Sequence, residues 1–295
     1  MTLSQLRYFC TIVEYMSFSR AADALYISQS AMSKSIRALE GELHCDLFVR
    51  NGKKLLLSSY GEVLLPYARE MVSHFDTMCT EARHALGQSG QELHVGIPPT
   101  AGYIFFHKVV ERFRQMHPEI RLVIEEGASK CVIDKVLNMK EELGIIIEPC
   151  LNPELVKLPV VQSEAVCLVS RRHRLANEES VSFAQLKDEP FYLISEDFMF
   201  YDLVLDKCRE AGFKPRIMFT NGHWEWIYSM VAENEGITIL PYPLVRRFLN
   251  DEVRALRLKD PSFPWVLSLT HHKNRVLSSP AKDFIQICQQ ESGTF

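Results

Sequence analysis

Five polar side chains between residues 29 and 37 are spaced so that they align along one flank of a helix. They are Gln29, Ser30, Ser33, Lys34 and Arg37, and helix residues three or four positions apart are neighbours on one face. Together they offer an amide, hydroxyls and cations. These groups suit hydrogen bonding to the base edges that the major groove of DNA exposes.

The apolar residues around this flank predict the elements that hold it. From Leu3 to Leu57 they fall into three short helical blocks and then a basic turn between two apolar runs, which is the order of a winged helix-turn-helix. Ser17 and Ser28 are placed to cap the second and third helices. A short side-chain oxygen at these positions satisfies N–H groups that a helix start leaves unpaired.

A small core and a basic wing complete this predicted domain. Apolar residues recur at three- and four-residue spacings, which is enough to bury one core. They are Phe9, Ile12, Val13, Phe18, Ala21, Ala22, Leu25, Ile27, Ala31, Ile36, Leu39, Leu43 and Leu47. The wing carries Arg50, Lys53 and Lys54, which we expect to contact phosphates.

The residues of this domain also form a recognisable signature. It comprises Ser17-Phe18-Ser19-Arg20-Ala21-Ala22, Leu25, Ile27-Ser28-Gln29-Ser30-Ala31-Met32-Ser33, Ile36, Leu39-Glu40, Leu43, Leu47-Phe48 and Arg50. This set resembles the DNA-binding signature of LysR-type transcriptional regulators, nearly without gaps to Glu62, and departs from it at Ser30, where many members have proline. The resemblance implies a regulator that binds double-stranded promoter DNA.

A long helix is predicted after the wing. Ser59 and Glu62 form a capping-box pattern, and the helix should run from about Tyr60 to Leu86 before Gly87, Ser89 and Gly90 end it. An apolar stripe follows it at steps of three and four, which indicates either a partner helix or packing on its own domain. The stripe is Leu64, Ala68, Met71, Phe75, Met78, Ala82 and Leu86. The resemblance implies the partner helix, since the family dimerises through this linker.

From Glu92 onward strands alternate with helices, which predicts a mainly parallel sheet with helices on both faces. The predicted strands cover 93–97, 120–125, 143–147, 165–169, 191–194, 216–220, 237–240 and 265–270. The predicted helices cover 101–115, 130–139, 199–211, 224–233 and 279–290. The resemblance implies two lobes, similar to periplasmic solute-binding proteins and hinged near Val161–Ser163.

The ligand site of such a region can be predicted by position. In open parallel sheets, ligands bind beyond the carboxyl ends of strands, where helix N-termini present unpaired N–H groups. Thr100 and Ser129 stand at two such helix starts, and their hydroxyls either cap the helix or hold a polar ligand head. The other lobe contributes residues that could cover an apolar ligand body. They are Phe198, Met199, Tyr201, His223 and Trp224.

Overall composition narrows the class of protein. A net charge of -4 over 295 residues means that any nucleic-acid contact must come from a local patch. The chain has no apolar run long enough for a membrane span and no signal-like start, so we expect a cytoplasmic protein without a membrane partner. Walker, Rossmann, metalloprotease and Gly-x-Ser-x-Gly patterns are absent, and we expect no enzyme.

The eight cysteines show no CxxC pair and no Cys/His cluster, so we expect reduced, mostly buried thiols and neither metal nor cofactor. His271 and His272 are adjacent on a predicted strand and would point to opposite faces. Some relatives sense oxidants through paired cysteines, which leaves a redox role for Cys167 or Cys208 open.

The predicted architecture is an N-terminal all-α winged helix-turn-helix, a long linker helix and a C-terminal α/β two-lobed effector region. The expected bounds are 1–58 for the DNA-binding domain, 59–89 for the linker, 90–161 with 269–295 for lobe I and 162–268 for lobe II. The expected partners are promoter DNA, a small-molecule effector with a polar or anionic head, and the chain itself as a homodimer or dimer of dimers. Two alternatives stay open: a thiol-based redox regulator, and a small-molecule-binding protein or enzyme on the two-lobed fold.

Overall fold

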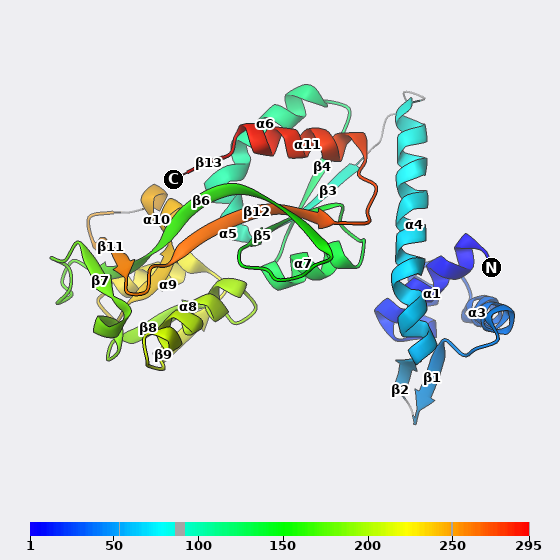
Figure 1. Cartoon of the computed structure of the whole chain (residues 1–295), viewed down its shortest axis with the longest axis horizontal. Helices are drawn as coiled ribbons and strands as arrows, with labels where there is room; N and C mark the ends of the chain where they lie inside the picture. The colour runs from blue at the N-terminus through cyan, green and yellow to red at the C-terminus, as the bar shows by residue number, and fades with distance from the viewer. Residues whose placement is uncertain (53, 86–91, 249, 295) are drawn as a thin grey trace. The chain divides into compact units, whose positions relative to one another are not determined.

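The computed structural model describes residues 1–52, 54–85, 92–248 and 250–294. These residues fold as two compact units (Figure 1). The described residues up to Ala85, together with Asn274–Ser278, form the first unit, and the remaining residues form the second.

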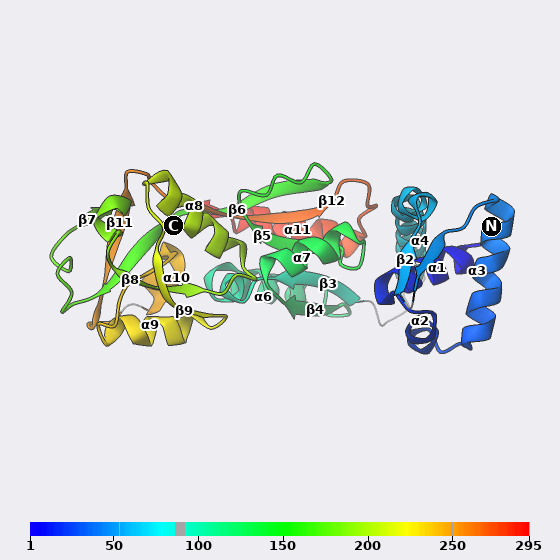
Figure 2. The ribbon, with the colours of Figure 1, turned by 90° about the horizontal axis from the view of Figure 1, so that it is seen from below.

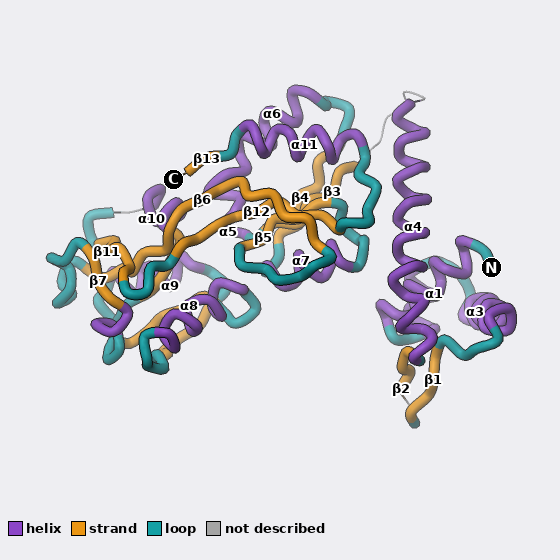
Figure 3. Tube along the Cα trace, viewed as in Figure 1, coloured by secondary structure: helices purple, strands orange, loops and turns teal. Residues whose placement is uncertain are grey.

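The first unit contains three short helices, a two-stranded wing and one long helix (Figure 3). Its elements are α1 Leu3–Tyr15, α2 Phe18–Ala24, α3 Gln29–Leu43, β1 Phe48–Asn51, β2 Lys54–Leu57 and α4 Ser59–Ala85. The predicted order of helices and wing is confirmed, and β1 pairs with β2 in antiparallel register. Figure 2 shows α3 from the side, from its start after α2 to the loop that enters β1.

Two of the predicted helix caps are confirmed. The Ser17 hydroxyl accepts a hydrogen bond from the backbone N–H of Arg20 at 3.3 Å, and the Ser28 hydroxyl accepts one from Ala31 at 3.2 Å. Both serines have extended backbone angles, as an N-cap requires. The start of α3 is therefore fixed at Gln29, the first residue of the predicted recognition flank.

The cap predicted for α4 is wrong by one residue. The Ser58 hydroxyl, rather than that of Ser59, accepts a hydrogen bond from the backbone N–H of Gly61 at 3.0 Å. The same hydroxyl donates to the carbonyl oxygen of Asp46 at 2.6 Å, so the wing holds Ser58 in the capping position. A capping box of Ser59 with Glu62 is not formed, and the predicted end of this helix beyond Ala85 lies outside the described residues.

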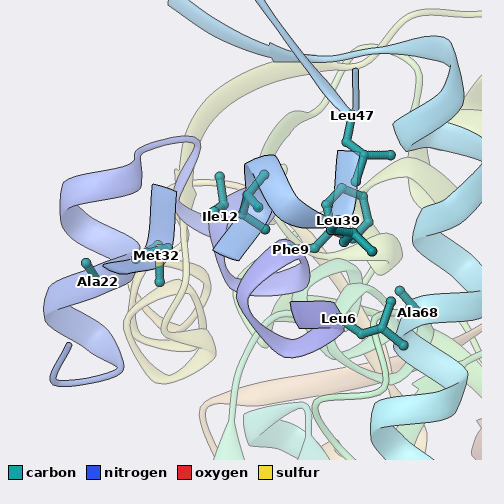
Figure 4. Packing of buried hydrophobic residues seen from close by; sticks show 10 residues of the cluster. Leu6, Phe9, Ile12, Ala22, Met32, Leu39, Leu47 and Ala68 are labelled. Atoms are coloured by element: carbon teal, nitrogen blue, oxygen red, sulfur yellow. The ribbon is translucent and has the colours of Figure 1, made fainter. Parts of the chain in front are cut away.

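The core of the first unit is made by α1, α2, α3, the residue before the wing and one residue of α4. Its buried members are Leu6, Phe9, Ile12, Ala21, Ala22, Met32, Ile36, Leu39, Leu47 and Ala68. Figure 4 shows Leu6 beside Ala68, where α1 meets α4. Ala31 and Leu43, predicted in this core, are exposed, because the buried residues of α3 begin with Met32 and end with Leu39.

The second unit is an α/β structure whose main sheet has the strand order β4-β3-β5-β12-β6-β11-β7, with β10 and β13 also paired to β6. Its strands are β3 Glu92–Ile97, β4 Arg121–Glu126, β5 Leu143–Ile147, β6 Leu155–Ser170, β7 Ser180–Ser182, β8 Pro190–Ile194, β9 Arg216–Asn221, β10 Thr238–Pro241, β11 Val253–Lys259, β12 Pro264–His272 and β13 Gly293–Thr294. Strands β3, β4 and β5 are parallel, and β8 and β9 form a separate parallel pair.

Helical segments connect these strands. They are α5 Pro99–Ala101, the π-helical turn η1 Gly102–Phe106, α6 His107–Met116, α7 Ser129–Leu137, the 3₁₀ turn η2 Phe183–Leu186, α8 Met199–Glu210, α9 Trp224–Ala232, α10 Tyr242–Phe248 and α11 Ser279–Gln290. The helix predicted over 101–115 is therefore three segments, because a π-turn interrupts it. The sequence did not predict β7, β11, β13 or α10.

Two long antiparallel strands, β6 and β12, run side by side through this unit (Figure 1). The strand predicted over 165–169 is only the end of β6, which spans 16 residues. The first half of β6 was not predicted as a strand because it contains Lys157 and Pro159. Pairing with β12 extends the strand through this half. The register shifts opposite Pro159 and Val161, close to the predicted hinge.

Two glycines let α7 lie close to the sheet. A Cβ on Gly144 would stand 2.8 Å from Val132 and 2.9 Å from Val136, and one on Gly96 would clash with the Glu141 carboxylate. Side chains at these strand positions would push α7 away. The glycines thus help to fix the position of α7, whose first residue is Ser129.

Candidate functional site

The structure brings part of the predicted recognition flank together with the wing. Gln29, Ser33 and Arg37 of α3 line one hollow of about 170 Å³ with Arg50 of β1. Their four-residue spacing keeps them on one side of the helix. An amide, a hydroxyl and two guanidinium groups therefore converge from two elements, which suits binding of base edges and nearby phosphates.

The other predicted residues of this surface are exposed. Ser30 and Lys34 project from α3, with the Ser30 hydroxyl 3.1 Å from that of Ser28, and Lys54 lies on β2. Lys53 lies outside the described residues. Within the described chain, Lys34, Arg37, Arg50 and Lys54 take part in no ion pair. Their charges are therefore available to an anionic partner.

The apolar stripe predicted on α4 divides into an inner and an outer part. Ala68 is fully buried and Leu64 packs against the core of its own unit. Met71, Phe75 and Met78 instead have exposed fractions of 52%, 40% and 58%. Ala82 is exposed as well, and Leu86 lies outside the described residues.

The outer part continues toward the start of α4 through residues that the stripe did not include. Tyr60, Val63 and Tyr67 are exposed by 63%, 67% and 63%. Their spacings of three and four could have identified them from the sequence. They were missed because the apolar stripe was assigned from Leu64 onward. Large apolar side chains in a continuous exposed row mark an interaction surface.

Thr100 and Ser129 follow adjacent parallel strands. Ile97 of β3 is paired with Glu126 of β4, and each hydroxyl residue stands three positions further on, in α5 and at the start of α7. Neither helix has a side-chain cap, since its N-cap residue is Pro98 or Ala128. The capping role that the sequence left open is therefore absent at both positions.

The Ser129 hydroxyl is the most informative group of this region. Its residue is fully buried, and no described protein group lies within hydrogen-bonding distance of Oγ. The Nε1–H of Trp224, the first residue of α9, is likewise buried without such a partner. Buried polar groups are normally paired, so both groups are candidates for binding a ligand.

The remaining predicted effector residues are not gathered in one place. Phe198 packs in the same apolar cluster as Trp224, whereas Met199 packs in a cluster with residues of α7. His223 is exposed at the N-cap of α9. Tyr201 lines a separate hollow of about 640 Å³ with residues that follow α8.

Contacts that the sequence did not predict join the segments before and after the predicted hinge. Lys130 Nζ donates to the carbonyl oxygen of Glu196 at 2.8 Å and lies 2.8 Å from the Asp202 carboxylate. Elsewhere, Arg247 donates to the carbonyl oxygen of Tyr103 at 2.6 Å. The Tyr103 ring also meets Trp224 edge-on, with ring centroids 6.4 Å apart. Segments on either side of the predicted hinge are therefore in direct contact.

The two cysteines considered for redox sensing are buried. Burial raises the pKa of the Cys208 thiol to about 12, and burial followed by the Glu189 charge raises the pKa of Cys167 as well. A thiol must ionise to react with an oxidant, so neither is poised to do so. In the part of the chain that the structure describes, no group of His, Cys, Asp and Glu is arranged to hold a metal.

A winged helix-turn-helix with free cations, followed by an α/β region with unpaired groups at helix starts, defines a DNA-binding protein with a ligand-binding domain. Residues 3–62 match the model of the bacterial regulatory helix-turn-helix protein of the lysR family, and residues 86–293 match the LysR substrate binding domain. The chain belongs to the LysR family of transcriptional regulators. The recognition, fold class and main function predicted from the sequence are confirmed.

Individual proteins agree with this assignment. The chain is 31% identical over 286 residues to the HTH-type transcriptional regulator YwbI of Bacillus subtilis (strain 168), covering 97% of this chain and 95% of that protein. Full-length OxyR from Pseudomonas aeruginosa has a similar fold, with a TM-score of 0.70, 23% identity, and coverage of 99% and 94%. The effector binding domain of QuiR, solved in complex with shikimate, has a TM-score of 0.62, 23% identity, and coverage of 69% and 98%.

Regulators of this family bind promoter DNA and small-molecule effectors and form oligomers. Among the described residues, no helix has both the length and the apolar character that crossing a membrane requires.

Because Cys167 and Cys208 are buried, we expect them to react with a thiol reagent more slowly than an exposed cysteine. With a chromogenic disulfide reagent at neutral pH, the exposed Cys131 should react promptly, whereas Cys167 and Cys208 should react only after unfolding. Mass spectrometry of labelled peptides measures this, and the urea-unfolded chain, with all eight thiols reactive, is the control. Rapid labelling of Cys208 in the folded chain would restore the redox alternative.

Proposed function

We propose that the chain reads a promoter site with Gln29, Ser33 and Lys34, and holds it through phosphate contacts of Arg37, Arg50 and the wing lysines. The observation that carries this proposal is the hollow shared by α3 and the wing, where Gln29, Ser33, Arg37 and Arg50 converge. The net charge of the chain is -4, so this local set of cations must provide the attraction to DNA.

The same proposal assigns a function to each part of the chain. Residues 1–58 bind DNA, residues 59–89 link and dimerise, and residues 90–295 bind the effector in two lobes. Two copies pair along the outer row of α4, and two such dimers assemble on DNA. As a regulator of transcription without an enzymatic step, the protein works in the cytoplasm, where the promoter lies.

The effector is a small molecule with a polar or anionic head. Ser129 and Thr100 hold the head beyond the ends of β3 and β4, where the N-terminus of α7 adds its unpaired N–H groups. Trp224 offers an N–H from the other side, and Phe198 covers the apolar part of the ligand. A small molecule is favoured over oxidation of Cys167 or Cys208 because the Ser129 hydroxyl has no protein partner among the described residues, whereas burial raises the pKa of both thiols.

The DNA contacts are tested by separating base reading from phosphate binding. The probe is the duplex that the wild-type chain selects from a random pool, compared with its scrambled sequence. Gln29→Ala should lose about 1–3 kcal/mol of discrimination if the amide makes a bidentate base contact. Arg50→Ala should weaken binding to both duplexes equally and reduce the slope of log affinity against log salt concentration by about one. Lys214→Ala, which removes an exposed cation from the second unit, is the control. Unchanged discrimination by Gln29→Ala would refute its assigned role.

The proposed dimer surface is tested by adding charge to the outer row of α4. Replacing Met71 and Phe75 by aspartate would place carboxylates in an apolar interface, where an unpaired charge is costly to bury. We expect dissociation to monomers in light scattering, with weaker binding to a two-half-site duplex. Glu62→Lys changes the charge of the same helix at an exposed position outside this row and should leave the dimer intact. Dimers that persist in the double variant would exclude this surface.

The effector site is tested first with shikimate, because the similar QuiR domain was solved with it, and then with a panel of other carboxylates. Calorimetry should show that Ser129→Ala and Trp224→Phe each make the binding free energy of a carboxylate ligand less favourable by about 1.5–3 kcal/mol, as expected for the loss of a hydrogen bond to a charged group. Without ligand, Ser129→Ala should not lower the melting temperature, since its hydroxyl has no protein partner. Ser229→Ala, on an exposed part of α9, is the matched control. Full affinity in both test variants would place the ligand elsewhere.

A further inference from the structure

Glu40 is the one acidic residue of the hollow that the recognition flank and the wing share. It stands on α3 one turn beyond Arg37, and Arg50 of the wing lines the same hollow. A carboxylate on a surface that faces phosphates repels them. Its presence therefore calls for a role that the base and phosphate contacts do not supply.

The carboxylate of Glu40 is bound to the backbone at the base of the wing. Oε1 accepts hydrogen bonds from the backbone N–H of Leu47 at 2.8 Å and of Phe48 at 3.4 Å. Leu47 is almost fully buried, and Phe48 is the first residue of β1. One side-chain oxygen thus joins the last turns of α3 to the strand that carries Arg50.

The opposite side of the same backbone segment is also fixed. The carbonyl oxygen of Leu47 accepts a hydrogen bond from Ser58 N–H at 2.9 Å, and the Ser58 hydroxyl donates to Asp46. A Cβ on Gly61 would stand 2.5 Å from that carbonyl oxygen, so the start of α4 closes over it. The wing base is held on α4 through Ser58 and on α3 through Glu40.

We propose that Glu40 is a positioning residue for DNA recognition. Its acceptor oxygen sets the distance and angle between the flank of α3 and the wing, so that Arg50 meets a phosphate while Gln29 faces a base. This inference rests on the DNA contacts proposed above. The acceptor oxygen performs this role, and the negative charge itself opposes DNA binding.

The test is a double-mutant cycle on DNA affinity, using the duplex selected by the wild-type chain. Glu40→Ala should weaken binding to about the same extent as Arg50→Ala. The double variant should bind nearly as well as either single variant, because a displaced wing no longer presents Arg50. The resulting coupling should be roughly 2- to 160-fold, the range for residues that act together.

Glu40→Gln separates the acceptor from the charge. Its amide oxygen can still accept from Leu47 and Phe48, so this variant should bind DNA at least as tightly as wild type, with a steeper salt dependence. Asp23→Ala, which removes a carboxylate at an exposed position of α2 that forms no ion pair within the described chain, is the control for charge alone. Amide hydrogen exchange at Leu47 and Phe48 should be fast in Glu40→Ala and slow in Glu40→Gln.

Three results decide the matter. Additive effects of Glu40→Ala and Arg50→Ala, or weak binding by a folded Glu40→Gln, would overturn the inference while leaving the DNA contacts standing. Arg50→Ala with wild-type affinity would overturn both. If Glu40→Ala does not fold, Glu40→Asp takes its place in the cycle. The aspartate carboxylate is one methylene too short to reach both N–H groups, so this variant should show the same coupling to Arg50→Ala.

Discussion

The burial of one face of α3 is the constraint on which the DNA-binding unit depends. Met32, Ile36 and Leu39 have exposed fractions of 0%, 1% and 0%, and burying each contributes about 1.5–3 kcal/mol. A helix with one face fixed has its opposite flank fixed as well. The direction in which Gln29, Ser33 and Arg37 point is thus set by apolar packing on the other side of the helix. Caps at Ser17 and Ser28 then decide where along the chain each helix starts, so the same polar residues cannot slide by one position.

The same reasoning explains why α4 carries two apolar rows instead of one. Near its start the helix packs on α1 through Ala68, and this contact is reinforced by the paired Arg7 and Asp76, whose closest atoms are 2.6 Å apart. The outer row from Tyr60 to Met78 faces away from that core and remains exposed. Apolar surface of this extent is costly in water unless it is covered. A helix that already has one covered face and keeps a second apolar row is suited to pairing with another copy.

The sequence predicted most of this architecture because its signals are local. Capping serines, a period of 3.6 and alternating strands are all read from neighbouring residues, and α7, α8 and α11 begin within one residue of their predicted starts or on them. The failures are tertiary. Strand β6 is long only because β12, β10 and β11 pair with it, and Ser58 rather than Ser59 caps α4 because Asp46 holds its hydroxyl. The hydrogen bond of Glu40, which entered only as a residue of the signature, and the ion pair of Lys130 were not predicted for the same reason, since their partners lie 7 and 72 positions away in the sequence.

Two buried polar groups of the second unit have no hydrogen-bond partner among the described residues. Leaving a buried donor or acceptor without a partner costs about 1–3 kcal/mol, and Ser129 and Trp224 each carry one such group at the first turn of a helix. A ligand that bonds to both removes this cost only where the segments bearing them approach each other. It therefore stabilises that arrangement over any other, and a ligand can shift a conformational equilibrium only through such a difference in affinity. The Lys130 pair with Asp202 and the Arg247 bond to Tyr103 already favour the same approach, so a ligand bound as proposed would add to a preference that the chain itself provides.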